Sequence, residues 1–374
     1  MEVSQFISQK FRFWAFISMV LLVFVHGYNL ELRYLQPWTM PGEPLTITSF
    51  TEYFLANGIL RFRIPMLFII SGFLYAMHDQ TPNKQRMGKR VRTLLVPYLL
   101  WSAIGILLTY VFELFPYTQD LVTSSHVVQI DDTRMLIHDY HWYEIIGRWI
   151  FFPVPYQLWF IRVLLIYNLA YPWIKWCVLN PTARWIFFGV VILMWLSTFG
   201  LVFFEGEGLL FFSLGVWMQK NNFNIEVPQK WFRPMVWAII FLTLAVGKTV
   251  LAFKGEAMIG NAVYPIITLM HKLTVLSGLI ACWFGLDPIV KWCMARPWFV
   301  WLSAFSFIIY ALHAPLVAYA INGMFAWLQP MEGYRLITFF VLPLAILSLC
   351  ILIGAVLRAL SPKFYGLLTG GRGI

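Results

Sequence analysis

The chain has 374 residues, of which 60% are hydrophobic and only 12% are charged. A soluble domain usually carries about 25% charged residues, so this composition excludes an ordinary soluble globular protein. The formal net charge of +10 does not indicate nucleic-acid binding, because the basic residues lie in short segments between long apolar runs. No RNA- or DNA-binding motif is present. The sequence therefore predicts an all-α, polytopic membrane protein with the lipid bilayer as its first partner.

Apolar runs long enough to cross a bilayer recur along the chain, and we expect about ten transmembrane helices in a single integral-membrane domain, residues 1–374. Their expected bounds are 13–30, 54–77, 93–113, 156–178, 185–203, 208–219, 234–252, 263–284, 298–320 and 335–358. The sixth run is short enough to be tilted, broken or re-entrant, and His271-Lys272 interrupts the eighth. Lys248 and this pair could contact an anionic substrate or lie at a membrane interface.

The loops between the runs alternate in charge. Lysine and arginine gather in every second loop, and most acidic residues lie in the others. By the positive-inside rule, this alternation places both termini in the cytoplasm. We therefore expect a multi-pass protein of the plasma membrane, that is, the cytoplasmic or inner membrane.

The first apolar run carries a histidine, His26, toward its outer end. Ionisable groups at membrane depth are costly, so they mark functional sites by default. An imidazole titrates near neutral pH and can take a proton from a hydroxyl group. The residues alone leave two interpretations open: a general base, or a histidine packed between helices and bonded to a neighbour.

Two arginines, Arg61 and Arg63, lie at the start of the second run. A guanidinium stays charged and donates several hydrogen bonds, so it could bind a phosphate or stabilise a developing oxyanion. The alternative is that it extends to the membrane interface. On a regular helix the two positions point about 160° apart, so we expect only one of them to face the interior. Ser71-Gly72, further along, is expected to allow close contact between helices.

The segment after the second run is basic, and its residues Lys89, Arg90 and Arg92 could hold the phosphates of a cytosolic nucleotide-like cofactor. The positive-inside rule by itself also explains these charges. The longest segment between runs, 114–155, is expected outside and mixes histidine with acidic residues. A metal site there is conceivable, but no ligand spacing repeats, so we expect a solvated loop and no metal. The four cysteines likewise show neither metal nor disulfide spacing.

Five motifs occur in order along the chain. They are Phe-Ile-Ser-Met-Val-Leu-Leu-Val-Phe-Val-His ending at His26, Arg-Phe-Arg-Ile-Pro-Met-Leu-Phe-Ile-Ile-Ser-Gly-Phe-Leu from Arg61, Lys-Arg-Val-Arg-Thr-Leu-Leu-Val-Pro-Tyr from Lys89, Leu-Trp-Phe-Ile-Arg ending at Arg162, and Ser-Phe-Ile-Ile-Tyr-Ala-Leu-His ending at His313. Together they resemble the acyltransferase-3 family of integral-membrane O-acyltransferases, and the resemblance covers most of the chain. The members that it resembles most O-acetylate or O-succinylate surface or periplasmic glycans.

The resemblance implies an acyl-CoA-dependent enzyme. It would move an acyl group, with acetyl favoured, from cytosolic acyl-CoA to a hydroxyl of an extracytoplasmic glycan or glycolipid. Acyl-CoA would be the donor co-substrate, and no permanently bound cofactor is expected. His26 would be the general base, and Arg61 would stabilise negative charge.

The resemblance also implies binding residues on both sides of the reaction. The family places an arginine eleven residues before the first-run histidine; Ala15 stands there in this chain, and we expect Arg12 to take its place. Residues expected to contact the acceptor substrate are Arg63, Trp159, Arg162, Tyr310 and His313. Residues expected to contact the CoA donor are Arg12, Lys89, Arg90 and Arg92.

A non-catalytic transporter or flippase for a glycolipid or an anion is the alternative from another class. Many spans with short or broken helices also suit a transporter, and His26 and the arginines would then only bind substrate. No pair of similar halves with matched breaks is visible, which favours the acyltransferase. Consumption of acyl-CoA by membranes separates the two.

Overall fold

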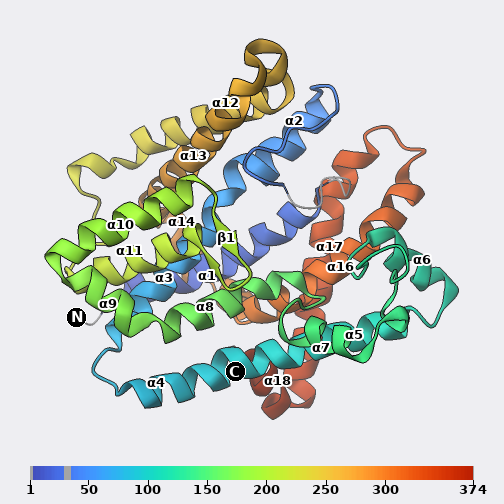
Figure 1. Cartoon of the computed structure of the whole chain (residues 1–374), viewed down its shortest axis with the longest axis horizontal. Helices are drawn as coiled ribbons and strands as arrows, with labels where there is room; N and C mark the ends of the chain where they lie inside the picture. The colour runs from blue at the N-terminus through green and yellow to red at the C-terminus, as the bar shows by residue number, and fades with distance from the viewer. Residues whose placement is uncertain (1–2, 29–34, 374) are drawn as a thin grey trace. The chain divides into compact units, whose positions relative to one another are not determined.

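The computed structural model describes residues 3–28 and 35–373, and this part of the chain is predominantly α-helical, as predicted (Figure 1). It forms two compact units. Unit 1 consists of the described residues of 1–25, 34–86 and 166–303, and unit 2 of those of 26–33, 87–165 and 304–374. Each unit therefore collects segments that are distant in the sequence.

Unit 1 begins with α1, whose last residue, His26, belongs to unit 2. Its elements are α1 (Gln5–His26), α2 (Ile47–Tyr53), the π-helix η2 (Phe54–Gly58), the 3-10 helix η3 (Ile59–Phe62), α3 (Arg63–Met77), α9 (Tyr171–Leu179), α10 (Pro181–Leu196), β1 (Gly200–Leu201), β2 (Phe204–Glu205), α11 (Gly206–Lys220), η7 (Lys230–Phe232), α12 (Pro234–Ile259), η8 (Gly260–Ala262), α13 (Val263–Gly285), α14 (Asp287–Met294) and α15 (Pro297–Ser303). The two short strands pair antiparallel and form the turn between α10 and α11.

Two helix pairs make the most extensive contacts within unit 1. The helices α12 and α13 pack against each other (Figure 1), and the turn between them starts at Gly260, whose φ of +56° is a left-handed conformation open to glycine. The helices α3 and α11 form the other pair. A Cβ atom on Gly72 would lie 2.0 Å from the carbonyl oxygen of Phe212. The expected close helix contact at Ser71-Gly72 is thereby confirmed.

Unit 2 is built around α16 and α17, which pack together. Its elements are η4 (Val91–Leu95), α5 (Val96–Phe112), α6 (Pro116–Ser125), η5 (Ile137–Asp139), α7 (Trp142–Ile150), η6 (Tyr156–Leu158), α16 (Ser306–Leu328), α17 (Tyr334–Leu360) and α18 (Pro362–Thr369). Two helices, α4 (Asn83–Arg90) and α8 (Trp159–Leu169), carry the chain from one unit into the other. The segment 114–155, expected to be a solvated loop, contains α6, η5 and α7 and packs a small apolar core that includes Val122, Val128 and Tyr140.

Six segments of the described chain are long and apolar enough to cross a membrane, which supports an integral, multi-pass membrane protein. They are Gln5–His26, Ile47–Met77, Asn83–Phe112, Pro234–Gly285, Ser306–Leu328 and Tyr334–Leu360. The fourth contains both α12 and α13, and a seventh results if α9 and α10, which are bent by 116°, count as one span. The total of ten and the cytoplasmic termini stay predictions.

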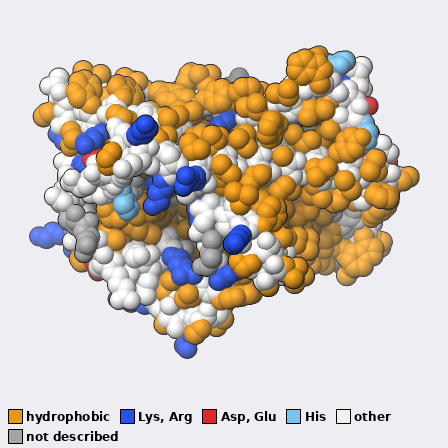
Figure 2. Space-filling model, turned by 90° about the horizontal axis from the view of Figure 1, so that it is seen from below, with side chains coloured by type: hydrophobic (Ala, Val, Ile, Leu, Met, Phe, Trp, Pro, Cys, Tyr) orange, Lys and Arg blue, Asp and Glu red, His pale blue; other side chains and the backbone are white. Residues whose placement is uncertain are grey.

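Much of the molecular surface is apolar, as contact with lipid requires. Figure 2 shows hydrophobic side chains over much of one face. Large apolar side chains are exposed on the helices themselves, for example Trp185 and Leu193 on α10 and Leu360 at the end of α17. In water such a surface would promote aggregation, whereas in a bilayer it faces hydrocarbon.

Several predicted helix bounds differ from the structure. The first helix begins at Gln5 and ends at His26, and residues 29–30 of the predicted run 13–30 lie outside the described residues. The prediction of one helix over 156–178 is wrong, because α8 ends at Leu169 and Pro172, which has no N–H to donate, lies in the first turn of α9. The run 298–320 is also divided, at residues 304–305.

The eighth run is continuous in the structure. His271 and Lys272 are 4% and 3% exposed, and α13 passes through them without a break. Within unit 1, His271 lies 3.0 Å from the Lys248 ammonium, and Lys272 faces Glu207 at 3.9 Å. A hydropathy profile detects the charge of such residues but not their partners.

Candidate active site

His26, the last residue of α1, lies beside two aromatic side chains of unit 2. Its Nδ1 atom is 2.9 Å from the hydroxyl oxygen of Tyr156. The His26 and His313 rings have centroids 5.3 Å apart. Of the predicted residues, the structure thus brings His26 and His313 together. It adds Tyr156, which the sequence reasoning had missed.

A second set of hydrogen bonds fixes the segment that carries Tyr156. The side-chain amide of Gln157 donates to the carbonyl of Ala311, 2.7 Å away. In return, the Tyr310 hydroxyl donates to the carbonyl of Gln157 at 2.6 Å. These reciprocal bonds join η6 to α16, so Tyr156 and His313 are held on elements that cannot shift independently. Tyr310, expected to contact substrate, has this positioning role in the structure.

His313 is completely buried, and its Nδ1 lies 2.8 Å from the Ile309 carbonyl one turn earlier in α16. A carbonyl only accepts hydrogen bonds, so Nδ1 carries the proton and neutral His313 has its lone pair on Nε2. For His26 the same reasoning gives two choices, because a tyrosine hydroxyl can donate or accept. If His26 donates from Nδ1 to Tyr156, its Nε2 is the basic nitrogen that proton abstraction requires.

Two more predicted residues lie on α8 in unit 2. Trp159 and Arg162 are half-buried, and the Arg162 guanidinium donates to the carbonyl of Phe151. The predicted donor residues Lys89 and Arg92 are exposed, whereas Arg90 is half-buried. Exposed cations are available to a phosphate, so these positions remain compatible with the predicted role.

Arg61 and Arg63 lie in unit 1, at the point where the helix changes type. Arg61 is in the 3-10 helix η3 and donates to the Leu35 carbonyl, and Arg63 begins α3 and donates to the Leu60 carbonyl at 2.5 Å. The Nε atoms of both arginines are buried. Arg63 is buried and Arg61 is half-buried, so the prediction that only one of them faces the interior stays a prediction.

A buried amine lies elsewhere in unit 1. The Lys248 ammonium is fully buried, 2.7 Å from the Asn57 carbonyl and 3.0 Å from Nδ1 of His271. Within the described chain no carboxylate pairs with Lys248, Arg61 or Arg63. Lys248 and Arg61 are close enough for their positive charges to repel each other. This group of cations would favour an anion, as the sequence suggested for Lys248 and His271.

Arg12 connects α1 to the end of α15. Its Nε donates to the hydroxyl of Ser303 at 2.7 Å and its Nη2 to the carbonyl of Val300 at 2.6 Å. A cation at these terminal carbonyls stabilises the helix end. Arg12 thus has a structural role, and its predicted contact with the donor stays a prediction.

Asp79, which follows α3, collects three cations. Its carboxylate lies 2.7 Å from Lys175, 2.6 Å from Lys220 and 3.0 Å from Arg86. Burial alone would raise the pKa of Asp79, but hydrogen bonds from Lys175, Lys220 and Tyr171 outweigh it and lower the pKa to about 2. Asp79 is therefore ionised at every physiological pH. The sequence reasoning missed this cluster because its members come from three separate helices.

The histidines of segment 114–155 do not gather around a common point. His138 pairs with Glu113 at 2.6 Å. Among the described residues, no group of three or more His, Cys, Asp or Glu side chains is arranged to hold a metal ion. The Glu113–His138 pair instead fastens η5 to the end of α5.

Comparison with known proteins gives one family. The model of the acyltransferase-3 family, described as "Acyltransferase domain", matches residues 10–357. Two similar relatives are each described as "Probable poly-beta-1,6-N-acetyl-D-glucosamine export protein", from Staphylococcus aureus strains MSSA476 and MRSA252. Each is 23% identical over 329 residues, which is 86% of this chain and 86% of the relative. No solved structure matches.

Proposed function

Because this chain belongs to the acyltransferase-3 family and is an integral membrane acyltransferase by that membership, we propose that it transfers an acyl group from acyl-CoA to a glycan hydroxyl. Acetyl is the favoured acyl group, and the acceptor lies on the extracytoplasmic side of the cytoplasmic membrane. The single observation that carries the proposal is the hydrogen bond between His26 Nδ1 and the Tyr156 hydroxyl. It gives the histidine an orienting partner of the kind that a general base needs.

The proposed reaction begins at the acceptor hydroxyl. His26 Nε2 takes the proton of the acceptor hydroxyl, and the oxygen attacks the thioester carbonyl carbon. The carbon–sulfur bond breaks, and the departing thiolate takes the proton from the His26 imidazolium. The products are an O-acyl ester and the free thiol of CoA, and His26 returns to its neutral form. The Nδ1–H group of His26 donates to the Tyr156 hydroxyl throughout, so Nε2 remains the reacting nitrogen.

The arginines supply the complementary charge. We assign Arg61, together with Arg63 or Arg162, to the negative charge that develops on the thioester oxygen. A guanidinium has five N–H donors, and the backbone carbonyl bonds described above use only part of that capacity. Lys89, Arg90, Arg92 and Arg12 would hold the phosphates of the donor from the cytoplasmic side.

The relatives suggest the class of acceptor. Their printed name refers to a β-1,6-linked polymer of N-acetylglucosamine. We therefore choose a β-1,6-linked N-acetylglucosamine pentasaccharide as the probe glycan. It offers free hydroxyls for O-acylation, and an ester formed on them is released by mild base, unlike the existing amides.

The test is acyl transfer from labelled acetyl-CoA to the probe glycan by membranes that contain the protein. We expect base-labile label with the wild type and a loss of at least about 100-fold in His26→Ala, since a general base contributes that much. His78→Ala is the matched control, because His78 is exposed and its Nδ1 lies at the Leu74 carbonyl of the preceding helix. Wild-type membranes without transfer, or His26→Ala membranes that transfer normally, would contradict the proposal.

The printed name of the relatives also favours a second function, the export of a glycan without acylation. In that case His26 and the arginines bind the passing polymer. Uptake of the probe glycan into inverted vesicles, with no consumption of acetyl-CoA, would identify this activity. The same His26→Ala membranes serve both assays.

A further inference from the structure

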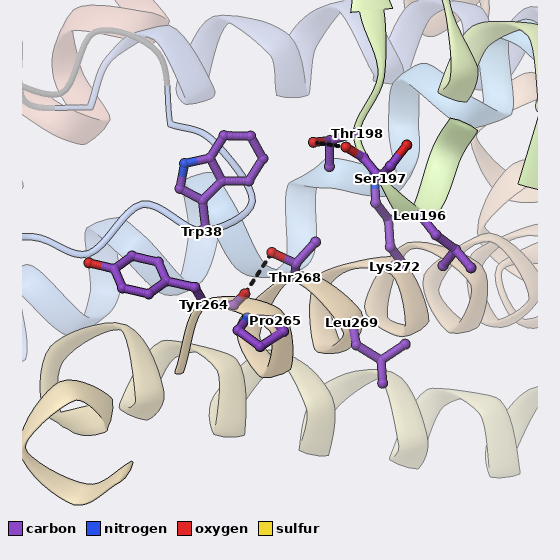
Figure 3. Close-up of a pocket in the computed structure, with 9 residues that line it drawn as sticks. All are labelled: Trp38, Leu196, Ser197, Thr198, Tyr264, Pro265, Thr268, Leu269 and Lys272. Carbon is purple, nitrogen blue, oxygen red and sulfur yellow. Dashed lines mark hydrogen bonds between the residues drawn. The ribbon is translucent and has the colours of Figure 1, made fainter. Parts of the chain in front are cut away.

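A pocket of about 580 Å³ opens in unit 1 (Figure 3). Three parts of the chain line it: Trp38 in the segment before α2, Ser197 and Thr198 after α10, and the first turns of α13. By the predicted topology, all three parts lie at the outer ends of membrane runs. A ligand entering this pocket would therefore come from the extracytoplasmic side.

Four hydroxyl groups line the pocket, and three of them, on Ser197, Thr198 and Thr268, donate their protons to backbone carbonyls. Thr268 donates to the Tyr264 carbonyl at 2.8 Å, Thr198 to the Ser197 carbonyl at 2.6 Å, and Ser197 to the Met194 carbonyl at 3.1 Å. Figure 3 shows the first two bonds. A hydroxyl whose proton is engaged offers its lone pairs, so these three groups are hydrogen-bond acceptors for a ligand.

A buried cation, Lys272, supplies the donors. It lines the pocket and is only 3% exposed. Within the described residues its ammonium has one ion-pair partner, Glu207 at 3.9 Å, which is beyond hydrogen-bond distance, and it lies 5.2 Å from the centre of the Trp195 ring. A buried ammonium has three N–H donors and is costly to leave without acceptors. A ligand oxygen in the pocket would supply the hydrogen-bond acceptor that the Lys272 ammonium needs.

The remaining walls are flat and apolar. Trp38 and Tyr264 are 37% and 42% exposed at the pocket, although both are large aromatic side chains. Aromatic rings present broad apolar faces, on which the C–H face of a sugar ring packs, while its hydroxyls reach the polar groups around it. A lipid tail does not fit, because it would leave the acceptors and Lys272 without partners. A simple anion does not fit either, because it would lie against three hydrogen-bond acceptors.

We propose that this pocket binds one N-acetylated hexose unit of the glycan. The ring packs against Trp38 and Tyr264, its hydroxyl and amide hydrogens are accepted by Ser197, Thr198 and Thr268, and Lys272 donates to one of its oxygens. The inference takes one element from the proposed function, namely the class of the acceptor glycan. It holds equally for an acyltransferase and for an exporter.

The experiment measures equilibrium binding of the probe glycan to the purified full-length protein in detergent, with no acyl donor present. We expect Thr268→Val to weaken binding about three- to tenfold, the value of one hydrogen bond. Thr274→Val is the matched control, since Thr274 makes the same bond to a carbonyl four residues earlier in α13 and does not line the pocket. Trp38→Ala should weaken binding at least about fivefold, with exposed Trp231→Ala as its control.

Lys272→Met tests the donor and keeps the length of the side chain, and we expect at least about a tenfold loss of binding. If this buried variant fails to fold, glycan binding by the Trp38→Ala and Tyr264→Ala variants, at half-exposed positions, still tests the pocket. The inference is overturned if the wild type does not bind the probe glycan, or if the pocket variants bind like their controls. Wild-type protein that binds the probe glycan but transfers no acyl group would contradict the proposed chemistry and leave the pocket standing, so the two failures are distinguishable.

Discussion

Removing one oxygen atom tests whether Tyr156 orients His26. In Tyr156→Phe the ring remains, and only the hydroxyl 2.9 Å from His26 Nδ1 is lost. A neutral hydrogen bond contributes about 0.5–1.5 kcal/mol, and one to a charged group about 1.5–3 kcal/mol. Because His26 is neutral before transfer and charged during it, the bond strengthens by about 1–1.5 kcal/mol on the way to the transition state. A difference of 1.36 kcal/mol is tenfold in rate.

We therefore expect Tyr156→Phe to lower kcat for acetyl transfer about tenfold, with KM for acetyl-CoA unchanged. Stability should fall by no more than about 1 kcal/mol, because His26 retains solvent access. Tyr319→Phe is the matched control: it removes a hydroxyl bonded at 2.7 Å to Thr109 on the same unit. Steady-state kinetics in membranes measure both variants. Equal kcat values for Tyr156→Phe and the wild type would refute the orienting role.

Three further predictions concern stability, each measured by thermal unfolding in detergent. Burial, with repulsion from a neighbouring carboxylate, raises the pKa of Glu205 from 4.5 to about 8. Between these two pH values the folded chain holds a proton that the unfolded chain has lost, so the free energy of unfolding falls as pH rises, by at most roughly 1.4 kcal/mol per pH unit. Glu205→Gln should make this fall less steep. Gly72→Ala should destabilise by about 1–3 kcal/mol, because its Cβ would lie 2.0 Å from the Phe212 carbonyl oxygen. Gly88→Ala, with open space around it, should instead stabilise α4 by about 0.5–1 kcal/mol. Asp79→Asn should cost about 1–3 kcal/mol by weakening three charged hydrogen bonds, and a melting temperature equal to that of the wild type would contradict the cluster.

The sequence by itself determined the class of the protein, because hydrophobicity acts locally. Long apolar runs and their alternating basic loops predicted an all-α membrane protein, and five short motifs indicated the family that the comparison then confirmed. Gly72 was expected at a helix contact, since only small residues permit such close approach. These inferences need no knowledge of which helix lies beside which.

The tertiary structure alone decided the partners of the polar residues. Tyr156 is 130 residues from His26 in sequence, and no periodicity links them. A π-turn and a 3-10 turn precede α3 around Arg61, a change of backbone geometry that hydropathy does not encode. Lys272 looked like an interruption of a span, yet it lies in a continuous helix beside a pocket. Side-chain partners depend on how distant segments pack, and packing is a property of the whole fold.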